Sequence, residues 1–375
     1  MENNIIITGG AGFIGSNLAL KLIEKGYNVR VLDNLSPQIH GEDAVLPEKL
    51  KEKVDFIKGD ITNKADWEKA LENQHVIIHL AAETGTGQSM YEVQKYVDVN
   101  INGTAILLNY LVNNKHSIQK VVVASSRAIY GEGKYLCKEH GIVYPGDREE
   151  KNLLAKDYDA KCPYCGQSAE LSATDENSKI HPSSVYGITK QNQEQMVLNV
   201  CKSIKVPAVA FRYQNVYGPG QSLKNPYTGI LSIFSTQIRN GNNINIFEDG
   251  EESRDFVFID DIVDATILGI EKEEANYEVF NVGSGKQTTV FEVATALNNL
   301  YEQKVSINIT GNFRLGDIRH NYADLEKIKA RLGFTPKFEF KEGVAHFAKW
   351  VASQDVETDR YSKSIDEMKA KGLFK

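Results

Sequence analysis

The chain has 375 residues, of which 41% are hydrophobic and 25% are charged, a composition typical of a folded globular protein. Its net charge of −7 argues against a nucleic-acid-binding protein, which needs a basic face. No apolar run approaches the roughly 18 residues of a membrane span, and the first residues lack a signal-peptide pattern. We therefore expect a cytoplasmic protein whose four cysteines are reduced thiols or metal ligands.

The N-terminal stretch combines a short β-branched run, a glycine-rich turn and a helical pattern. Ile5–Thr8 is apolar and too short for a helix, so it predicts a buried strand. Glycines at positions 9, 10, 12 and 15 follow, before a helix expected over Ser16–Lys25. Glycines let backbone N–H groups approach an anion, and a helix N-terminus adds positive charge. The spacing predicts a dinucleotide-binding turn, with an ordinary tight turn as the alternative.

An acidic residue follows the second expected strand. Asp33 ends this strand about twenty residues after the glycines, where an acid accepts hydrogen bonds from ribose hydroxyls and repels a 2′-phosphate. No arginine comes directly after Asp33. The pattern therefore favours NAD over NADP.

Strands and helices alternate through the first 216 residues. The expected strands are Ile5–Thr8, Asn28–Leu32, Asp55–Lys58, Val76–Leu80, Lys120–Ala124 and Ala208–Arg212. The expected helices are Ser16–Lys25, Lys64–Leu71, Tyr91–Val112 and Tyr186–Cys201. Such alternation predicts an α/β fold with a doubly wound parallel sheet (Rossmann fold), which binds ligands at the carboxyl ends of its strands.

The remaining segments depart from this alternation. Residues 133–182 form a polar insertion within the 1–216 domain. Residues 217–354 mix strands and helices and predict a smaller α/β substrate lobe. Within it, a segment of about residues 254–283 is expected to return to the main sheet, with strands at Phe256–Ile259 and Val279–Val282. Residues 355–375 are a charged tail, either a surface helix or partly disordered.

A tyrosine, a lysine and a serine are the candidate catalytic residues. Tyr186 and Lys190 lie four positions apart on an expected helix, so both can face one ligand. A tyrosine titrates at about 10, and a neighbouring ammonium or an oxidised nicotinamide favours its phenolate. Ser126 ends a strand and could pass a proton to Tyr186, with Ser125 as its rival. The alternative for Tyr186 and Lys190 is an ordinary amphipathic helix, and the alternative for Ser126 is a strand-end turn without a catalytic role.

These motifs resemble the extended short-chain dehydrogenase/reductases of the NAD-dependent nucleotide-sugar epimerase/dehydratase family over about residues 1–350. The matching motifs are Thr8-Gly-Gly-Ala-Gly-Phe-Ile-Gly15, Asp33-Asn34, Gly59-Asp60-Ile61, His79-Leu-Ala-Ala82, Asn100-Ile-Asn-Gly-Thr104, Ser125-Ser126, Tyr186-x-x-x-Lys190, Arg212-Tyr-Gln-Asn215, Arg254-Asp-Phe256 and Arg314-x-Gly-Asp317.

The resemblance implies a role for each residue at these motifs. Catalysis falls to Ser126, Tyr186 and Lys190, and alignment with the family selects Ser126 over Ser125. NAD is expected to contact Gly9, Gly12, Phe13, Ile14, Gly15, Asp33, Asn34, Asp60, Ile61, Leu80, Ala81, Ala82, Asn100, Tyr186, Lys190 and Tyr213. The nucleotide sugar is expected to contact Ser126, Asn215, Phe247, Arg254 and Arg314, with surface ion pairs as the alternative for the arginines and core packing for Phe247. A homodimer paired through the 91–112 and 186–201 helices is also expected.

The residues after Ser126 bear on the reaction. Dehydratases of the family are expected to carry an Asp-Glu pair there, whereas this chain has Arg127-Ala128. This favours inversion at C4 through a transient 4-keto sugar. Further segments resemble the dTDP-L-rhamnose 4-epimerase-like branch and imply a dTDP-6-deoxyhexose such as dTDP-L-rhamnose. The alternatives are a 4,6-dehydratase, a 4-ketoreductase, a UDP-hexose 4-epimerase and a non-enzymatic NAD sensor, and Arg127 leaves the pocket shape open.

The insertion carries two pairs of potential metal ligands. Cys137-x-x-His140 and Cys162-x-x-Cys165 stand about twenty residues apart, the spacing of a tetrahedral zinc site. Because the segment has few apolar residues, a metal would supply its folding energy. We expect a structural, zinc-ribbon-like Zn²⁺ site, with unpaired thiols or a redox-active Cys162/Cys165 pair as alternatives. Cys201 is expected to be a buried hydrophobic residue.

Overall fold

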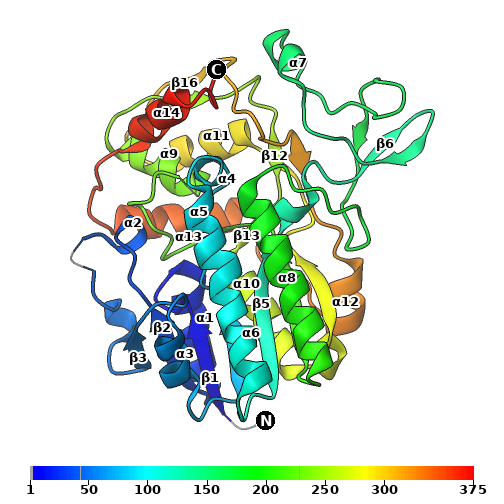
Figure 1. Ribbon diagram of the computed structural model, residues 1–375. Helices are drawn as coiled ribbons and strands as arrows, with labels where there is room; N and C mark the ends of the chain where they lie inside the picture. Colours follow the sequence, from blue (N-terminus) through cyan, green and yellow to red (C-terminus); the bar gives the residue numbers. More distant parts are fainter. Residues whose placement is uncertain (1–2, 43, 228) are drawn as a thin grey trace.

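The computed structural model describes residues 3–42, 44–227 and 229–375. The first two residues of the predicted 1–216 domain and residue 228 of the predicted substrate lobe lie outside this range. A parallel seven-stranded sheet with the order β14-β9-β5-β4-β1-β2-β3 forms the centre of the molecule (Figure 1). Its strands are β1 (Asn4–Thr8), β2 (Asn28–Asp33), β3 (Asp55–Lys58), β4 (Val76–His79), β5 (Lys120–Ser126), β9 (Ala208–Tyr213) and β14 (Glu278–Val282).

Helices cover both faces of the sheet, which is why its strands are apolar on both sides. One face packs around Ile6, Ile77 and Val121, against α3 (Lys64–Leu71), α6 (Gly103–Asn113) and α8 (Val185–Ser203). The other face packs around Ile5, Ile7 and Val122, against α1 (Phe13–Glu24) and α10 (Ile259–Glu271). The predicted doubly wound sheet is therefore confirmed. Among the described helices, we find none with the length and apolar character of a transmembrane segment.

Two predicted elements differ from the structure. The strand expected at Phe256–Ile259 does not join the main sheet, because β14 already occupies the free edge of β9. Instead, β13 (Phe256–Phe258) pairs with β10 (Asn215–Tyr217). The helix expected over Tyr91–Val112 is divided into α5 (Val93–Tyr96), the π-helical η2 (Val97–Asn102) and α6. A π-helical turn often marks a functional site.

Much of the second half of the chain, apart from β9, α10 and β14, forms a smaller lobe at the carboxyl ends of the main strands (Figure 1). Its helices are α9 (Ile230–Arg239), α11 (Val290–Leu300), α13 (Phe340–Ala352) and α14 (Tyr361–Ala370). Its strands are β11 (Ile244–Ile246), β12 (Ser253–Arg254), β15 (Thr288–Thr289), β16 (Ile307–Ile309) and β17 (His320–Asn321). Short helices elsewhere are α2 (Pro37–His40), η1 (Glu48–Leu50), α4 (Thr86–Ser89), η3 (Arg127–Tyr130), η4 (Glu273–Ala275) and α12 (Glu326–Leu332).

The C-terminal segment is part of this lobe. Helix α14 buries Met368, and the Phe374 ring packs edge-on against Phe247 with centroids 5.0 Å apart. Residues 355–375, predicted as a charged tail, therefore contribute to the lobe's apolar contacts. Tyr361, Ile365 and Met368 of the helix, with Leu373 and Phe374 after it, gather in one apolar cluster with Phe247, which composition alone did not show.

The insertion forms a small antiparallel sheet at one side of the molecule (Figure 1). Strand β6 (Tyr135–Cys137) pairs with both β7 (Gly141–Val143) and β8 (Glu170–Leu171), and α7 (Glu150–Leu154) follows β7. Its apolar cluster has five buried residues: Tyr135, Cys137, Val143, Ala160 and Cys162. So small a cluster cannot by itself hold a segment of this length.

The turn between β1 and α1 requires glycine. Gly9 has a φ of +68°, a conformation that side chains disfavour. A Cβ on Gly15 would lie 2.4 Å from the Gly9 carbonyl oxygen and 2.6 Å from the Gly10 Cα. Helix α1 therefore begins in direct contact with the backbone of the preceding turn.

We predict that Gly15→Ala lowers the free energy of unfolding by about 1–3 kcal/mol, because the added methyl group meets backbone atoms that cannot move aside. The matched control is Gly146→Ala, whose Cβ would meet no atom within 4 Å. Chemical denaturation of both variants measures the difference. Equal unfolding energies would show that the turn is not tightly packed.

Candidate active site

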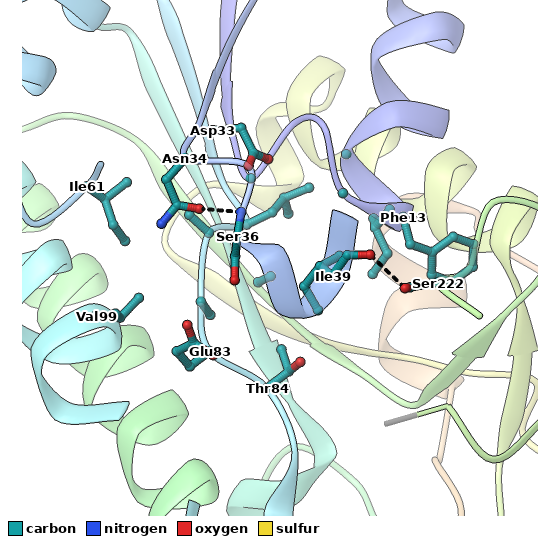
Figure 2. Close-up of a pocket in the computed structure, with 18 of the residues that line it drawn as sticks. Phe13, Asp33, Asn34, Ser36, Ile39, Ile61, Glu83, Thr84, Val99 and Ser222 are labelled. Carbon is teal, nitrogen blue, oxygen red and sulfur yellow. Dashed lines mark hydrogen bonds between the residues drawn. The ribbon is translucent and has the colours of Figure 1, made fainter. Parts of the chain in front are cut away.

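A cleft of about 340 Å³ lies at the carboxyl ends of β1 and β4, where the strand order reverses (Figure 2). Ligands of doubly wound folds bind at this position. All but one of the residues predicted to contact NAD line this cleft: Gly9, Gly12, Phe13, Ile14, Gly15, Asp33, Asn34, Asp60, Ile61, Leu80, Ala81, Ala82, Tyr186, Lys190 and Tyr213. Further lining residues that the sequence did not assign to the cofactor include Ser36, Ile39, His40, Glu83, Thr84, Val99 and Ser222.

The N-terminus of α1 faces this cleft. The first turn of α1, all of it within the described residues, has no acidic side chain, and its N-cap Gly12 provides no side-chain hydrogen bond. The first N–H groups of a helix have no partner within the helix. With the helix dipole, they form a site for an anionic group such as a phosphate.

The Asp33 carboxylate is held in place by the backbone. Its two oxygens accept hydrogen bonds from the N–H groups of Ala11, at 3.0 Å, and Leu35, at 2.8 Å. This fixes an acceptor at the end of β2, where a ribose is expected. Ser222 donates a hydrogen bond of 2.8 Å to the Ile39 carbonyl and so closes the cleft from the second lobe (Figure 2).

Asp60 and Asn34 form a hydrogen-bonded pair beside the cleft. Asn34 donates a hydrogen bond of 3.0 Å to one carboxylate oxygen of Asp60. The hydroxyl and the backbone N–H of Thr62 both donate to the other oxygen of Asp60, each at 2.8 Å. Burial acts to raise the pKa of Asp60, but the hydrogen bonds from Thr62 and Asn34 outweigh it and lower that pKa. Asp60 therefore lines the cleft as a carboxylate.

Asn100 is the predicted cofactor residue that does not line the cleft. It is fully buried in η2. Its amide bonds the backbone N–H and carbonyl of Glu83, at 2.8 and 3.1 Å, and the Thr189 hydroxyl, at 2.9 Å. Asn100 therefore joins the loop after β4 to α8, and the predicted contact of its side chain with the cofactor stays a prediction. The Tyr213 ring lines the cleft, while its hydroxyl bonds Thr266 at 2.7 Å.

A second cleft, of about 370 Å³, lies between the sheet and the smaller lobe. All the predicted substrate residues line it: Ser126, Asn215, Phe247, Arg254 and Arg314. Tyr361, Ser364 and Met368 of α14 line it too, and the sequence did not predict them. The two clefts share several lining residues, among them Ser126 and Tyr186. A ligand in one cleft therefore meets a ligand in the other at these two side chains.

Protein contacts hold two arginines in the second cleft. Arg254 donates to the carbonyls of Ser253 and Arg319 at 2.8 and 2.9 Å, and to that of Ile318 at 2.7 Å. Arg314 pairs with Asp317 at 2.7 Å and lies over the Phe247 ring, 5.3 Å from its centroid. A guanidinium group presents several N–H donors in a planar fork, which suits both arginines to an anionic ligand.

Arg127 presents a third guanidinium to the same cleft. Within the part of the chain that the structure describes, its side chain makes no hydrogen bond or ion pair. Burial and the nearby Arg254 charge lower the pKa of Arg127 to about 9, so it is still a cation at neutral pH. The cleft thus contains a positive group that the protein itself does not pair.

The serine and tyrosine lie in contact where the clefts meet. The Ser126 hydroxyl accepts the Ala128 N–H at 3.1 Å and forms a hydrogen bond with Tyr186. Burial raises the pKa of Tyr186, whereas the Ser126 hydrogen bond and the Arg127 charge act to lower this pKa. The sequence predicted that the Lys190 ammonium would play this opposing role. Burial instead lowers the pKa of Lys190 to about 7, so part of its charge is lost at neutral pH.

A buried chain of polar side chains leads from Lys190 to the loop after β4. Lys190 donates to Gln193 at 2.8 Å, and Gln193 donates to Thr104 at 2.8 Å. His79 lies between Thr104, at 3.0 Å, and Thr8, at 2.8 Å. Burial and the Lys190 charge lower the pKa of His79 to about 3, so the imidazole is neutral. This chain fixes the position of Lys190, and the family resemblance had marked all of its members except Gln193.

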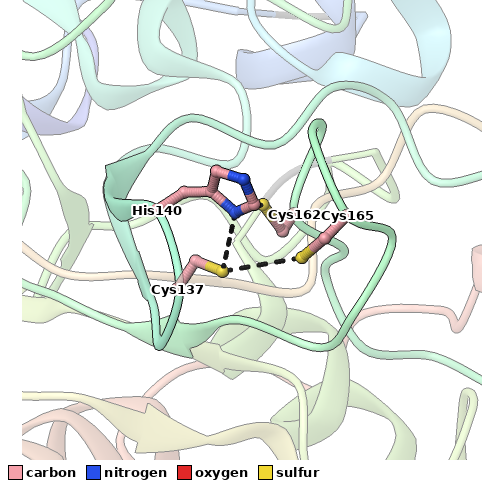
Figure 3. Close-up of side chains that lie close together, drawn as sticks. All are labelled: Cys137, His140, Cys162 and Cys165. Carbon is pink, nitrogen blue, oxygen red and sulfur yellow. Dashed lines mark hydrogen bonds between the residues drawn. The ribbon is translucent and has the colours of Figure 1, made fainter.

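The four predicted metal ligands meet at one point in the insertion (Figure 3). Their ligand atoms all lie within 4.8 Å of one another. The Cys137 sulfur is 3.6 Å from His140 Nδ1 and 3.7 Å from the Cys165 sulfur, and the Cys162 sulfur is 3.7 Å from the same nitrogen. Ligands about 2.0–2.3 Å from one tetrahedral zinc ion would be about 3.5–3.8 Å apart. The arrangement therefore fits zinc, and all four cysteines are free of disulfides. Cys201 is buried in α8, as expected.

Comparison with known proteins agrees with this geometry. The model of the NAD dependent epimerase/dehydratase family matches residues 5–151 and 160–283 and is interrupted only inside the insertion. A dTDP-L-rhamnose 4-epimerase from Burkholderia thailandensis is 38% identical over 352 residues, covering 93% of this chain and 95% of the relative.

Solved structures show the same similarity. A UDP-glucose 4-epimerase from Thermotoga maritima, solved with UDP-glucose, is 30% identical with a TM-score of 0.73, covering 93% of this chain and 98% of the other. A UDP-glucuronic acid 4-epimerase from Bacillus cereus, solved with UDP-glucuronic acid and NAD, is 25% identical with a TM-score of 0.75, covering 93% and 99%. The chain therefore belongs to the NAD-dependent epimerase/dehydratase family of enzymes.

Proposed function

We propose that this protein is an NAD-dependent nucleotide-sugar 4-epimerase acting on a dTDP-6-deoxyhexose such as dTDP-L-rhamnose. The observation that supports this most directly is that the dinucleotide cleft and the arginine-lined cleft share Ser126 and Tyr186. A nucleotide sugar bound by its diphosphate at Arg254 and Arg314 can thus reach the proton-transfer groups beside the nicotinamide.

The chain's own residues carry the proton transfer. The first cleft holds NAD, which when bound supplies a reversible hydride acceptor. Tyr186 takes the proton from the sugar 4-hydroxyl as the hydrogen at C4 departs as hydride, and the two losses together leave a 4-keto sugar. When the hydride is restored to the opposite face of C4, Tyr186 returns the proton to the 4-oxygen of the inverted product. Ser126 shares the proton through its hydrogen bond to Tyr186. Lys190 would hold the nicotinamide ribose, and the net redox change is zero.

The choice of epimerisation and of substrate rests on two observations. Arg127 and Ala128 follow Ser126 where an acidic pair would assist loss of water, and the Burkholderia relative is named for the dTDP-L-rhamnose reaction. A UDP-hexose is the second candidate, because the Thermotoga structure contains UDP-glucose. Incubation with dTDP-, UDP-, CDP- and GDP-sugars, followed by NMR of the products, separates these substrates. A dehydrated or reduced product would contradict the proposal.

We predict that Tyr186→Phe lowers kcat by at least about 10²-fold, because the proton acceptor is lost. NAD content should change little, since Tyr186 is one of many residues lining the dinucleotide cleft. Product formation and bound NAD are measured on the same preparation. Activity close to that of the wild type would exclude Tyr186 as the base.

Arg127 should influence the pH dependence of the reaction. Its positive charge favours the Tyr186 phenolate and lowers the pKa of Tyr186. Removing that charge in Arg127→Ala therefore raises this pKa, and the rising limb of kcat/KM moves to higher pH. Arg127→Lys, which keeps a cation, should shift the limb less. If the limb does not move in Arg127→Ala, the charge does not act on Tyr186.

We further propose that Cys137, His140, Cys162 and Cys165 hold a structural Zn²⁺ ion. Supporting this are the convergence of the four ligand atoms and the small apolar cluster of the insertion. Elemental analysis should find one zinc per chain, and Cys162→Ser should lose most of it. The control Cys201→Ser should retain the metal, because Cys201 lies in α8 outside the cluster. Purified protein without zinc, or equal zinc in both variants, would contradict the site.

A homodimer is also proposed. Helices α6 and α8 pack side by side, and Val93, Val97, Val112 and Ile188 are exposed on α5, η2, α6 and α8. Apolar side chains on one helical layer suit burial against a second copy. Light scattering would measure the mass in solution, and a monomer at micromolar concentration would contradict this proposal.

A further inference from the structure

Residues 141–161 link the two ligand pairs of the insertion and are called the bridging loop here. His140 directly precedes this loop and Cys162 directly follows it. A metal bound by both pairs would therefore close the loop at its two ends. The loop includes β7 and α7, and its far end lies close to the C-terminus of the chain (Figure 1).

Arg148 of the bridging loop connects two segments that form the wall of the substrate cleft. Its side chain is only 4% exposed. It donates two hydrogen bonds, of 3.2 and 2.9 Å, to the carbonyl of Asp317, and Asp317 lines the cleft. It also pairs with Glu248 at 2.8 Å, and Glu248 directly follows the cleft residue Phe247. Its Nε lies 3.4 Å from a Glu132 oxygen. One buried guanidinium thus joins three separate segments.

The apolar side chains of the loop contact the back of the same wall. Leu153 and Tyr158 form a buried cluster with Phe313, against which Leu315 packs. Arg314 lies between these two residues in an extended segment and lines the cleft. Alternate side chains of an extended chain point to opposite sides. The loop therefore supports the reverse side of the segment that presents Arg314 to the substrate.

We propose that the metal centre and its bridging loop position the substrate wall, with Arg148 as a positioning residue. Metal occupancy then controls the affinity for the nucleotide sugar, while the proton-transfer groups and the dinucleotide cleft are unaffected. The reason is that a metal bound at both ends of the bridging loop restricts the conformations of the loop. The small apolar cluster of the insertion cannot impose this restriction by itself. This inference rests on the proposed zinc site and on a nucleotide sugar occupying the second cleft.

Hydrogen exchange tests the structural part of this inference without any substrate. The amides of Phe313 and Leu315 donate hydrogen bonds to the carbonyls of Lys375 and Leu373, at 2.8 and 3.0 Å, and should therefore exchange slowly. Removing the metal with a chelator should accelerate exchange across residues 313–319 and leave the amides of β1 unchanged. Unchanged exchange at 313–319 would overturn the inference, and this result does not depend on which sugar the enzyme uses.

Kinetics test the functional part with the metal in place. Arg148→Ala should retain zinc and NAD, raise KM for the nucleotide sugar about tenfold and change kcat by less than about twofold, the pattern expected when binding is lost equally from the ground state and the transition state. Arg148→Lys keeps the charge but not the planar guanidinium group, so its KM should lie between those of Arg148→Ala and the wild type. Direct titration of the nucleotide sugar into each NAD-loaded variant should give the same order of affinities.

A matched control is Arg30→Ala on β2. Arg30 also bonds one carboxylate, Asp55 at 2.7 Å, and three backbone carbonyls, but it lines neither cleft. The Arg30→Ala variant should therefore have the wild-type KM for the nucleotide sugar. An unchanged KM in Arg148→Ala, or equal losses of kcat, NAD and substrate affinity, would overturn the inference. If the wild-type enzyme binds no nucleotide sugar, the proposed function fails instead, and hydrogen exchange still decides the structural part.

Discussion

The close approach of the β1–α1 turn to its neighbours is the constraint on which the rest of the site depends. A Cβ on Gly9 would lie 2.9 Å from the Ala81 backbone, and one on Gly10 would lie 2.8 Å from the Val31 side chain. The turn therefore touches the segment after β4 and strand β2 at once. This contact sets the helix N-terminus, the Asp33 carboxylate and the loop after β4 around one cleft at the reversal of strand order. The floor of the cleft is thus built from the carboxyl ends of the central strands, and loop residues such as Ser222 close it from above.

Burial gives the catalytic groups their chemical character. It raises the pKa of Tyr186 and lowers that of Lys190, so it opposes the charged form of both side chains. Only groups that stabilise a phenolate can then make Tyr186 a base, and the structure provides a hydrogen bond from Ser126 and the charge of Arg127. An oxidised nicotinamide in the first cleft would add a further positive charge. Proton transfer is thereby linked to occupancy of the clefts.

Local patterns were sufficient to predict the sheet, the dinucleotide cleft and the convergence of Cys137, His140, Cys162 and Cys165, because each depends on residues with a fixed spacing in short motifs. Features set by long-range contacts were not predictable in this way. Phe256–Phe258 is apolar enough for the main sheet, but β14 takes that edge. Asn100 matches a family motif, yet its amide is used within the protein. The part of α14 in the substrate cleft, and Arg148 behind it, were missed because they are held by contacts between distant parts of the chain, such as Glu367 with Tyr227 and Arg148 with Asp317.

The most direct test of the account follows the hydrogen at C4 of the sugar. The enzyme is incubated with dTDP-L-rhamnose deuterated at C4, and the product is examined by NMR and mass spectrometry. The account predicts a C4-inverted sugar of unchanged mass that still has deuterium at C4, since the same hydride leaves and returns. Loss of the deuterium to solvent during inversion, or a product that is lighter by one water, would contradict it.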